Sequence, residues 1–251
     1  MVLTSSYKSD ILLSSFFEKI AYQKAQNFAS ISLQSLDINF VFMNILAQII
    51  KNRNTILDIG TGNGYVLSEI NKKFPDYDLS LVGIDNSQKM LDIAFQCQNI
   101  KYLCCDNNNI PLSDKTFDII TAKNVTRFNP KELSRLLKDN SFFLMREYSE
   151  GKGLVEVSRL FKERLIRSRT ILFYQTILSE AGFSIQKVFP FKMKRTFADV
   201  EHIITTIKTY PFIEDFSSSD EDTIRKNFPK KTVVITSDPF ILLAKKEHQR
   251  D

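Results

Sequence analysis

Short apolar runs alternate with amphipathic stretches along residues 54–150. Four of these runs have the length of buried strands, and they are Thr55-Ile56-Leu57, Leu81–Asp85, Ile100–Asp106 and Phe117–Ala122. The intervening stretches include a helical segment at Lys131–Lys138. Strands that alternate with helices predict an α/β fold, in which a mostly parallel, doubly wound sheet carries helices on both faces.

The flanking regions show other patterns. Residues 7–50 are predicted to be helical, because apolar residues from Ile11 to Ala21 recur at helical spacing and a second helix fits Asp37–Lys51. After residue 150 we expect helices at 153–167, 170–181, 198–208 and 220–227, and strands at 184–191, 232–235 and 240–245. Gly182 is a suitable C-terminal cap for the second of these helices.

A chain of 251 residues without a long linker fits one domain. We therefore expect a single domain over 1–251, in which residues 1–53 form a helical N-terminal cap and residues 54–150 form a cofactor-binding core. Residues 151–251 form the substrate-side half, with a small insertion at about 192–231 before the last strand.

A glycine-rich turn follows the first predicted strand and has the sequence Asp58-Ile59-Gly60-Thr61-Gly62-Asn63-Gly64. The nicotinamide fingerprint would need Gly or Ala where Tyr65 stands, and the phosphate loop would need a Lys after its last glycine. An acid just before the first glycine would repel a pyrophosphate but suits a cation. S-adenosylmethionine fits, since it carries a sulfonium and an ammonium and no phosphate.

Two further acids end the next two predicted strands, Asp85 and Asp106, and Asn107 follows the second of them. An acid at the end of the second strand of a doubly wound fold hydrogen-bonds ribose hydroxyls. The third acid can accept a hydrogen bond from the adenine amino group, and nicotinamide enzymes do not need it.

Asp58, Asp85 and Asp106, with the glycine turn, resemble class I S-adenosylmethionine-dependent methyltransferases of the type 11-like small-molecule group. Phe117–Ala122 is similar to that family's fourth strand and Lys131–Lys138 to the helix before its fifth, and the resemblance spans roughly residues 15–245. The chain departs from the family at Asp139-Asn140-Ser141, where Pro-Gly-Gly is usual, although Asn also adopts the left-handed turn conformation.

The resemblance implies a Rossmann-like sheet of seven strands and a set of cofactor-binding residues. They are Asp58, Gly60, Thr61, Gly62, Asn63 and Gly64 for the methionine part, Asp85 and Asn86 for the ribose, Asp106 and Asn107 for the adenine, and Lys123 at the end of the fourth strand.

Methyl transfer from a sulfonium is an in-line displacement, so the enzyme chiefly aligns the nucleophile, excludes water and, where needed, removes a proton. Candidates for a catalytic role are Glu147, His202 and Tyr22, and candidates for binding the substrate are Arg127, Arg146, Tyr148 and Lys152. The cations among them would favour a carboxylate or phosphate on the acceptor. The alternatives are core packing for Tyr22, a surface position for His202, and ion pairs of the cations with Glu147 and Glu150.

Charge and cysteine content narrow the function classes. The net charge is +5, but 34 basic and 29 acidic residues are mixed along the chain, whereas nucleic-acid readers usually cluster their charge. Lys123-Asn124-Val125-Thr126 also differs from the Asn-Pro-Pro-Tyr motif of enzymes that methylate exocyclic base amines. The three cysteines have no metal-ligand spacing, so we expect no metal. No apolar run has the length of a membrane span and the first twenty residues carry charges, which predicts a cytoplasmic protein.

The N-terminal run from Phe17 to Gln34 is similar to the start of the malonyl carrier-protein methyltransferases of biotin synthesis. We therefore expect S-adenosylmethionine-dependent methyl transfer to a small-molecule or carrier-bound acceptor. Two alternatives remain open, namely an RNA methyltransferase and a non-catalytic subunit that binds S-adenosylmethionine.

Overall fold

The computed structural model describes residues 37–166, 169–229 and 231–248. The described part of the chain begins at Asp37. The predicted N-terminal helix with Tyr22 lies outside the described residues. The expectation of one domain over 1–251 stays a prediction.

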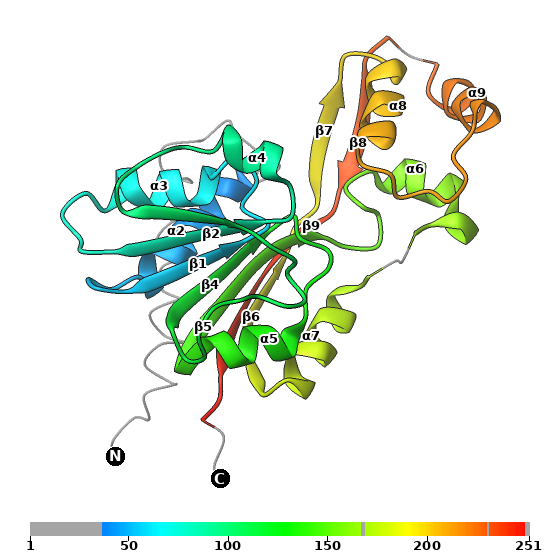
Figure 1. Ribbon diagram of the computed structural model, residues 1–251. Helices are drawn as coiled ribbons and strands as arrows, with labels where there is room; N and C mark the ends of the chain where they lie inside the picture. Colours follow the sequence, from blue (N-terminus) through cyan, green and yellow to red (C-terminus); the bar gives the residue numbers. More distant parts are fainter. Residues whose placement is uncertain (1–36, 167–168, 230, 249–251) are drawn as a thin grey trace, which may run out of the picture. The chain divides into compact units, whose positions relative to one another are not determined.

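A sheet of seven strands forms the centre of the described unit, in the order β3-β2-β1-β4-β5-β9-β6 (Figure 1). Its strands are β1 (Thr55–Ile59), β2 (Ser80–Asp85), β3 (Ile100–Cys104), β4 (Phe117–Lys123), β5 (Leu137–Tyr148), β6 (Phe183–Pro190) and β9 (Pro239–Lys246). The first five strands in this order pair in parallel, and β9 is antiparallel to both β5 and β6. The predicted fold class, including the seven-stranded Rossmann-like sheet, is confirmed.

Helices cover both faces of this sheet. They are α2 (Ile38–Ile49), α3 (Tyr65–Lys73), α4 (Gln88–Asp92), α5 (Pro130–Leu136) and α7 (Ile171–Glu180). Leu57, Ile59 and Met145 pack with α5 and α7 in one buried cluster. Because successive side chains of a strand alternate between faces, Asp58 and Arg146 belong to the opposite face, where α2 contacts both α3 and β5. Figure 1 shows α2 and α3 on one side of the sheet and α5 and α7 on the other.

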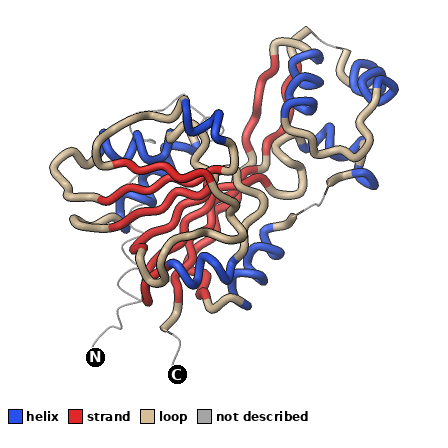
Figure 2. Tube along the Cα trace, in the orientation of Figure 1, coloured by secondary structure: helices blue, strands red, loops and turns tan. Residues whose placement is uncertain are grey.

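The segment between β6 and β9 forms a smaller second core. It contains β7 (Met193–Phe197), α8 (Val200–Thr209), α9 (Ser218–Asn227) and β8 (Val233–Ser237), and β7 pairs with β8 in antiparallel fashion. Helix α6 (Val155–Leu160) and the 3-10 turn Lys162–Arg164 join it, and buried residues from Leu154 to Ile235 form its apolar cluster. Figure 2 shows the two strands with helices beside them. The insertion was expected at 192–231 with helices, and strand β7 was not predicted.

Two predicted helices are shorter than the sequence suggested. The helix expected over 131–138 ends at Leu136, because Leu137 already pairs with Phe117 as the start of β5. The helix expected over 153–167 is limited to α6 and the 3-10 turn, since Gly153 has a φ of 78° and Phe161 interrupts the helix. Asn140 does adopt the left-handed conformation, with a φ of 62°.

Candidate functional site

The glycine turn between β1 and α3 is left-handed at all three glycines, with φ values of 60°, 55° and 74° at Gly60, Gly62 and Gly64. A Cβ at Gly60 would lie 2.5 Å from Cγ2 of Val125, and one at Gly64 would lie 2.3 Å from the hydroxyl oxygen of Tyr102. A Cβ at Gly62 would meet only Met90, at 3.3 Å. Packing therefore requires glycine at Gly60 and Gly64, whereas at Gly62 only the flexible end of Met90 is near, so a ligand can approach the backbone there.

Asp58 is buried beneath this turn and faces the protein. Its two carboxylate oxygens accept hydrogen bonds from the hydroxyls of Thr61 and Thr121, each at 2.7 Å. Burial raises the pKa of Asp58 to about 6, and the two hydroxyls partly oppose that rise. Asp58 thus links the turn, through Thr61, to strand β4, through Thr121. Thr121 was not predicted from the sequence.

Asp85, at the end of β2, reaches across to the turn. Its Oδ2 accepts the N–H of Gly62 at 2.8 Å, and its Oδ1 accepts the N–H of Ser87 at 2.9 Å. Each carboxylate oxygen has a further lone pair, so Asp85 can still accept two hydroxyl donors. Asn86 is exposed directly beside it.

Beyond β3, Asp106 is exposed, and its Oδ1 accepts both the backbone N–H and the side-chain amide of Asn108, at 2.8 and 2.7 Å. Asn107 places a buried Oδ1 without any hydrogen-bond partner next to it. An unpaired buried acceptor is costly, so a donor at this place would be bound favourably.

Lys123 ends β4 on the same side as the turn. Its ammonium lies 4.6 Å above the ring of Tyr65, the first residue of α3. Burial lowers the pKa of Lys123, and the nearby Arg146 lowers it further. Asn63 is exposed at the tip of the turn.

These groups suit S-adenosylmethionine. The carboxyl ends of β1, β2 and β3 supply an open glycine backbone, an acid with free lone pairs and an orphaned amide oxygen. An anionic carboxylate would meet the ammonium of Lys123, and among the described residues neither the turn nor the ends of β1, β2 and β3 hold a cluster of cations suited to a pyrophosphate.

Arg146, on β5, is a buried cation whose partners are neutral. One terminal nitrogen donates to Oδ1 of Asn124 and the other to the hydroxyl of Tyr148 at 3.1 Å, while the guanidinium lies 4.7 Å from the Tyr148 ring centre. Its Nε is buried without a partner. No carboxylate of the described residues forms an ion pair with it, and Lys123 is its register partner on β4. Asn124 was not predicted. The signal in the sequence was an Asn directly after a strand, a residue type that tolerates the left-handed conformation seen here, with a φ of 61°.

Glu147 points to the opposite face and is also buried. Its Oε1 accepts the N–H of Tyr148 at 2.8 Å, and its Oε2 has no hydrogen-bond partner. Burial raises the pKa of Glu147, while the charges of Arg146, Lys152 and Arg169 partly offset this effect.

Thr126, in the loop after β4, binds two residues whose charge or pKa is coupled to Glu147. Its carbonyl accepts hydrogen bonds from Arg169 and from the hydroxyl of Tyr174, the latter at 3.3 Å. The charge of Glu147 contributes to a raised pKa of Tyr174, although burial is the larger cause. Neither Arg169 nor Tyr174 was predicted from the sequence.

The predicted substrate cations do not meet at one place. Arg146 and Lys152 belong to the surroundings of Tyr148 and Glu147, on opposite faces of β5, and Arg127 is exposed. Arg146 also makes no ion pair with Glu147 or Glu150, the alternative considered from the sequence, among the residues that the structure covers. His202 is exposed on α8 in the insertion, with its ring 6.0 Å from that of Phe197.

The described residues offer neither a metal site nor a membrane-spanning helix. No group of three or more His, Cys, Asp or Glu side chains could hold a metal ion there. No helix in the same part of the chain is long and apolar enough to cross a membrane.

Comparisons with known proteins point to one family. Residues 56–144 match the model of a methyltransferase domain. A ubiquinone/menaquinone biosynthesis C-methyltransferase, UbiE, from Rickettsia typhi is 25% identical over 92% of this chain and 93% of its own length. The UbiE of Rickettsia prowazekii is 30% identical over 58% of this chain, which covers 64% of that relative, slightly under two thirds of its length.

One further relative and one solved structure are also similar to this chain. A malonyl-[acyl-carrier protein] O-methyltransferase from Marinomonas is 28% identical over 47% of each chain. A solved structure of a putative methyltransferase from Bacillus halodurans superposes with a TM-score of 0.62 and 19% identity, over 82% of this chain and 99% of that one. This last likeness shows the fold.

Proposed function

Since this chain belongs to the class I S-adenosylmethionine-dependent methyltransferases, we propose that it methylates a small-molecule or carrier-bound acceptor that carries an anionic group. The observation that most supports the methyltransferase activity, through its cofactor site, is the hydrogen bond from the N–H of Gly62 to Asp85. It joins the open glycine turn to the strand-end acid, so that one ligand can touch both.

The cofactor residues follow from this arrangement. The turn from Gly60 to Gly64 and Lys123 would hold the methionine part, Asp85 with Asn86 the ribose, and Asp106 with Asn107 the adenine. Asp58 contributes by holding the turn through Thr61 and Thr121 rather than by touching the ligand. The bound cofactor supplies an activated methyl group.

Arg146 supports the anionic acceptor. A buried charge without a counterion is destabilising unless something compensates it, and the unpaired Nε of Arg146 leaves one donor free. A carboxylate or phosphate on the acceptor would provide that compensation by a charge-assisted hydrogen bond. The same position at the carboxyl ends of β4 and β5 is where acceptors of open α/β sheets bind.

The relatives' names support the acceptor class. One group of them is named for C-methylation in ubiquinone and menaquinone biosynthesis, and another for O-methylation of a malonyl-[acyl-carrier protein]. The mixed charge of this chain, with 34 basic and 29 acidic residues, favours such acceptors over RNA. A cytoplasmic location remains a prediction.

Calorimetry with S-adenosylhomocysteine and with NAD tests the cofactor, and we expect only the former to bind. Transfer of a labelled methyl group from S-adenosylmethionine to a panel of free and carrier-bound carboxylic acids tests the acceptor. NAD binding without S-adenosylhomocysteine binding would contradict the proposal. Cofactor binding without turnover on any acceptor, including RNA, would favour a non-catalytic subunit, and RNA binding that weakens steeply with salt would favour an RNA substrate.

A further inference from the structure

A cavity of about 550 Å³ lies where the main sheet meets the insertion. It is lined by the loop after β5, by α6, by the first residue of α7 and by the junctions of β6 with β7 and β8 with β9. Its volume is in the range of small-molecule sites. None of the residues that we assign to the cofactor or to the anionic group of the acceptor lines it.

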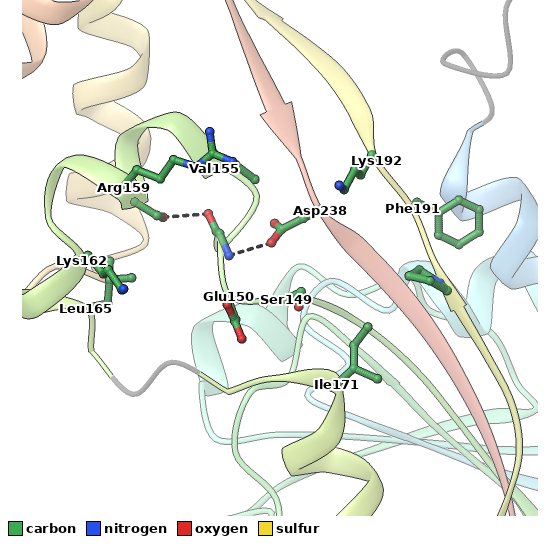
Figure 3. Close-up of a pocket in the computed structure, with 13 residues that line it drawn as sticks. Ser149, Glu150, Val155, Arg159, Lys162, Leu165, Ile171, Phe191, Lys192 and Asp238 are labelled. Carbon is green, nitrogen blue, oxygen red and sulfur yellow. Dashed lines mark hydrogen bonds between the residues drawn. The ribbon is translucent and has the colours of Figure 1, made fainter.

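The floor and walls of the cavity are largely apolar. Val155, Leu165, Ile171 and Phe191 contribute aliphatic and aromatic surface, and they come from separate elements. Figure 3 shows Ile171 and Phe191 across the cavity from Leu165 and Val155. Apolar side chains that converge on an open space favour a ligand with an apolar segment.

Three cations surround this apolar space. Arg159 and Lys162 lie on one side and Lys192 on the other (Figure 3). All three are exposed, and no ion pair involves them among the described residues. Such cations attract an anionic group at the mouth of an apolar space.

Two acids also line the cavity but oppose the cations only partly. Both oxygens of Asp238 already accept backbone N–H groups, from Gly151 at 2.6 Å and from Gly153 at 2.9 Å. Glu150 is the other acid, and it is exposed. The formal charge of the lining is therefore positive, with three cations and two acids.

The position of the cavity relates it to the acceptor site. Ser149, which lines it, directly follows the last residue of β5 and is three residues beyond Arg146 in the chain. At about 3.3 Å per extended residue, the two backbone positions are at most about 10 Å apart. An acceptor held at Arg146 would therefore have to pass the carboxyl end of β5 and be at least about that long to enter the cavity.

We infer that this cavity binds the distal part of an elongated amphiphilic acceptor, a linear apolar chain that carries a phosphate or carboxylate. The apolar chain packs against Val155, Leu165, Ile171 and Phe191. Its distal phosphate or carboxylate, a second anionic group besides the one assigned to Arg146, binds Arg159, Lys162 and Lys192. This inference rests on the proposed function, because it extends the acceptor of the same enzyme.

The test uses the full chain and three probes, namely octyl phosphate, octanol and inorganic phosphate, each titrated by calorimetry below any micelle-forming concentration. We expect octyl phosphate to bind at least about tenfold more tightly than either fragment, since only it uses both surfaces. The variant with Lys162→Gln and Lys192→Gln should bind it about threefold to tenfold more weakly. The matched double variant Lys226→Gln with Lys231→Gln removes two exposed lysines that do not line the cavity, and it should bind like wild type.

A second variant, Ile171→Asp, introduces an acid among the apolar walls and should weaken the binding of octyl phosphate by about tenfold or more. Unchanged S-adenosylhomocysteine affinity and an unchanged melting temperature verify that this variant is folded. Equal binding of octyl phosphate by wild type and both cavity variants would overturn the inference, as would the absence of octyl phosphate binding by a protein that binds S-adenosylhomocysteine. Absence of S-adenosylhomocysteine binding would contradict the proposed function itself.

Discussion

The backbone N–H of Gly62 donates to Oδ2 of Asp85 over 2.8 Å. These residues are far apart in the sequence, but β1 and β2 are neighbouring parallel strands, so their carboxyl ends meet at one edge. The bond orients the carboxylate toward the open side of the turn. It also makes the acid part of the turn's structure as well as a candidate ligand group.

Replacement of Asp85 by Ala should weaken S-adenosylhomocysteine binding by about 30- to 1,000-fold, or roughly 2–4 kcal/mol, because two hydroxyl donors lose a charged acceptor. Calorimetry measures the effect. The control is Asp92→Ala, which removes an exposed acid from the end of α4 and should leave the affinity unchanged. Unchanged affinity in a natively folded Asp85→Ala protein would remove Asp85 from the site.

Much of this fold was predictable because it depends on local pattern. The apolar runs at β1, β2 and β4 and the left-handed turn at Gly60–Gly64 are properties of neighbouring residues. Strand β7 was missed since Met193–Phe197 contains Lys194, Arg195 and Thr196, all exposed, and so has no apolar run. Its pairing with β8 is formed by residues about forty positions away, and no local pattern reports such a contact.

Only those site residues that follow directly from residue types at strand ends were predictable from the sequence. Sequence spacing placed Arg146 and Lys152 together, but Arg146 and Glu147 alternate across β5 and Lys152 adopts a φ of 52° in the following turn. Thr121 and Asn124 act through contacts with Asp58 and Arg146 from another strand or loop. Such partners are set by tertiary packing rather than by sequence position.

The three glycines should respond differently to Ala. Gly62→Ala should destabilise the fold by only about 1–2 kcal/mol, the strain of a left-handed non-glycine residue, whereas Gly60→Ala and Gly64→Ala add contacts of 2.5 and 2.3 Å with Val125 and Tyr102. Urea titrations give the free energy of unfolding of each of the three variants and so rank their stabilities. In a Gly64→Ala background, Tyr102→Phe should restore part of the stability, because it removes the hydroxyl oxygen that the new Cβ would meet. A Gly64→Ala protein as stable as Gly62→Ala would contradict this account.

The pH dependence of stability should carry the signature of Asp58. Its folded pKa of about 6 exceeds the ordinary value of 3.8, so the folded state binds the proton more tightly than the unfolded state. The contribution of Asp58 to the free energy of unfolding is therefore most favourable below about pH 4 and declines as pH rises to about 6, by about 3 kcal/mol in total.

Asp58→Asn removes that titration. The difference in unfolding free energy between the variant and wild type should shift in favour of the variant by about 2.5 kcal/mol from pH 4 to pH 7.5. Urea titrations at both pH values give this difference, and equal urea slopes verify that the unfolding reaction is the same. A difference that stays constant across this range would show that Asp58 keeps an ordinary pKa.

The last prediction separates two roles for Arg146, a structural brace and an anion-binding group. Its hydrogen bonds to Asn124 and Tyr148 favour a brace, whereas the buried charge without a counterion favours a ligand site. Loss of a brace lowers stability. Loss of an uncompensated buried charge relieves a desolvation penalty, so an apolar residue of similar length is tolerated or stabilising.

We therefore expect Arg146→Met to retain or raise the melting temperature of the free protein. Its kcat/KM for the best anionic acceptor should fall roughly 30- to 150-fold, which corresponds to about 2–3 kcal/mol of lost transition-state stabilisation. S-adenosylhomocysteine affinity should stay within about twofold, because Arg146 is on β5 whereas the residues assigned to the cofactor lie at the ends of β1 to β4. Arg127→Met, at an exposed arginine of the preceding loop, is the matched control and should behave like wild type. A lower melting temperature with wild-type kcat/KM would assign Arg146 to the structure alone, and the acceptor would then need no anionic group at this position.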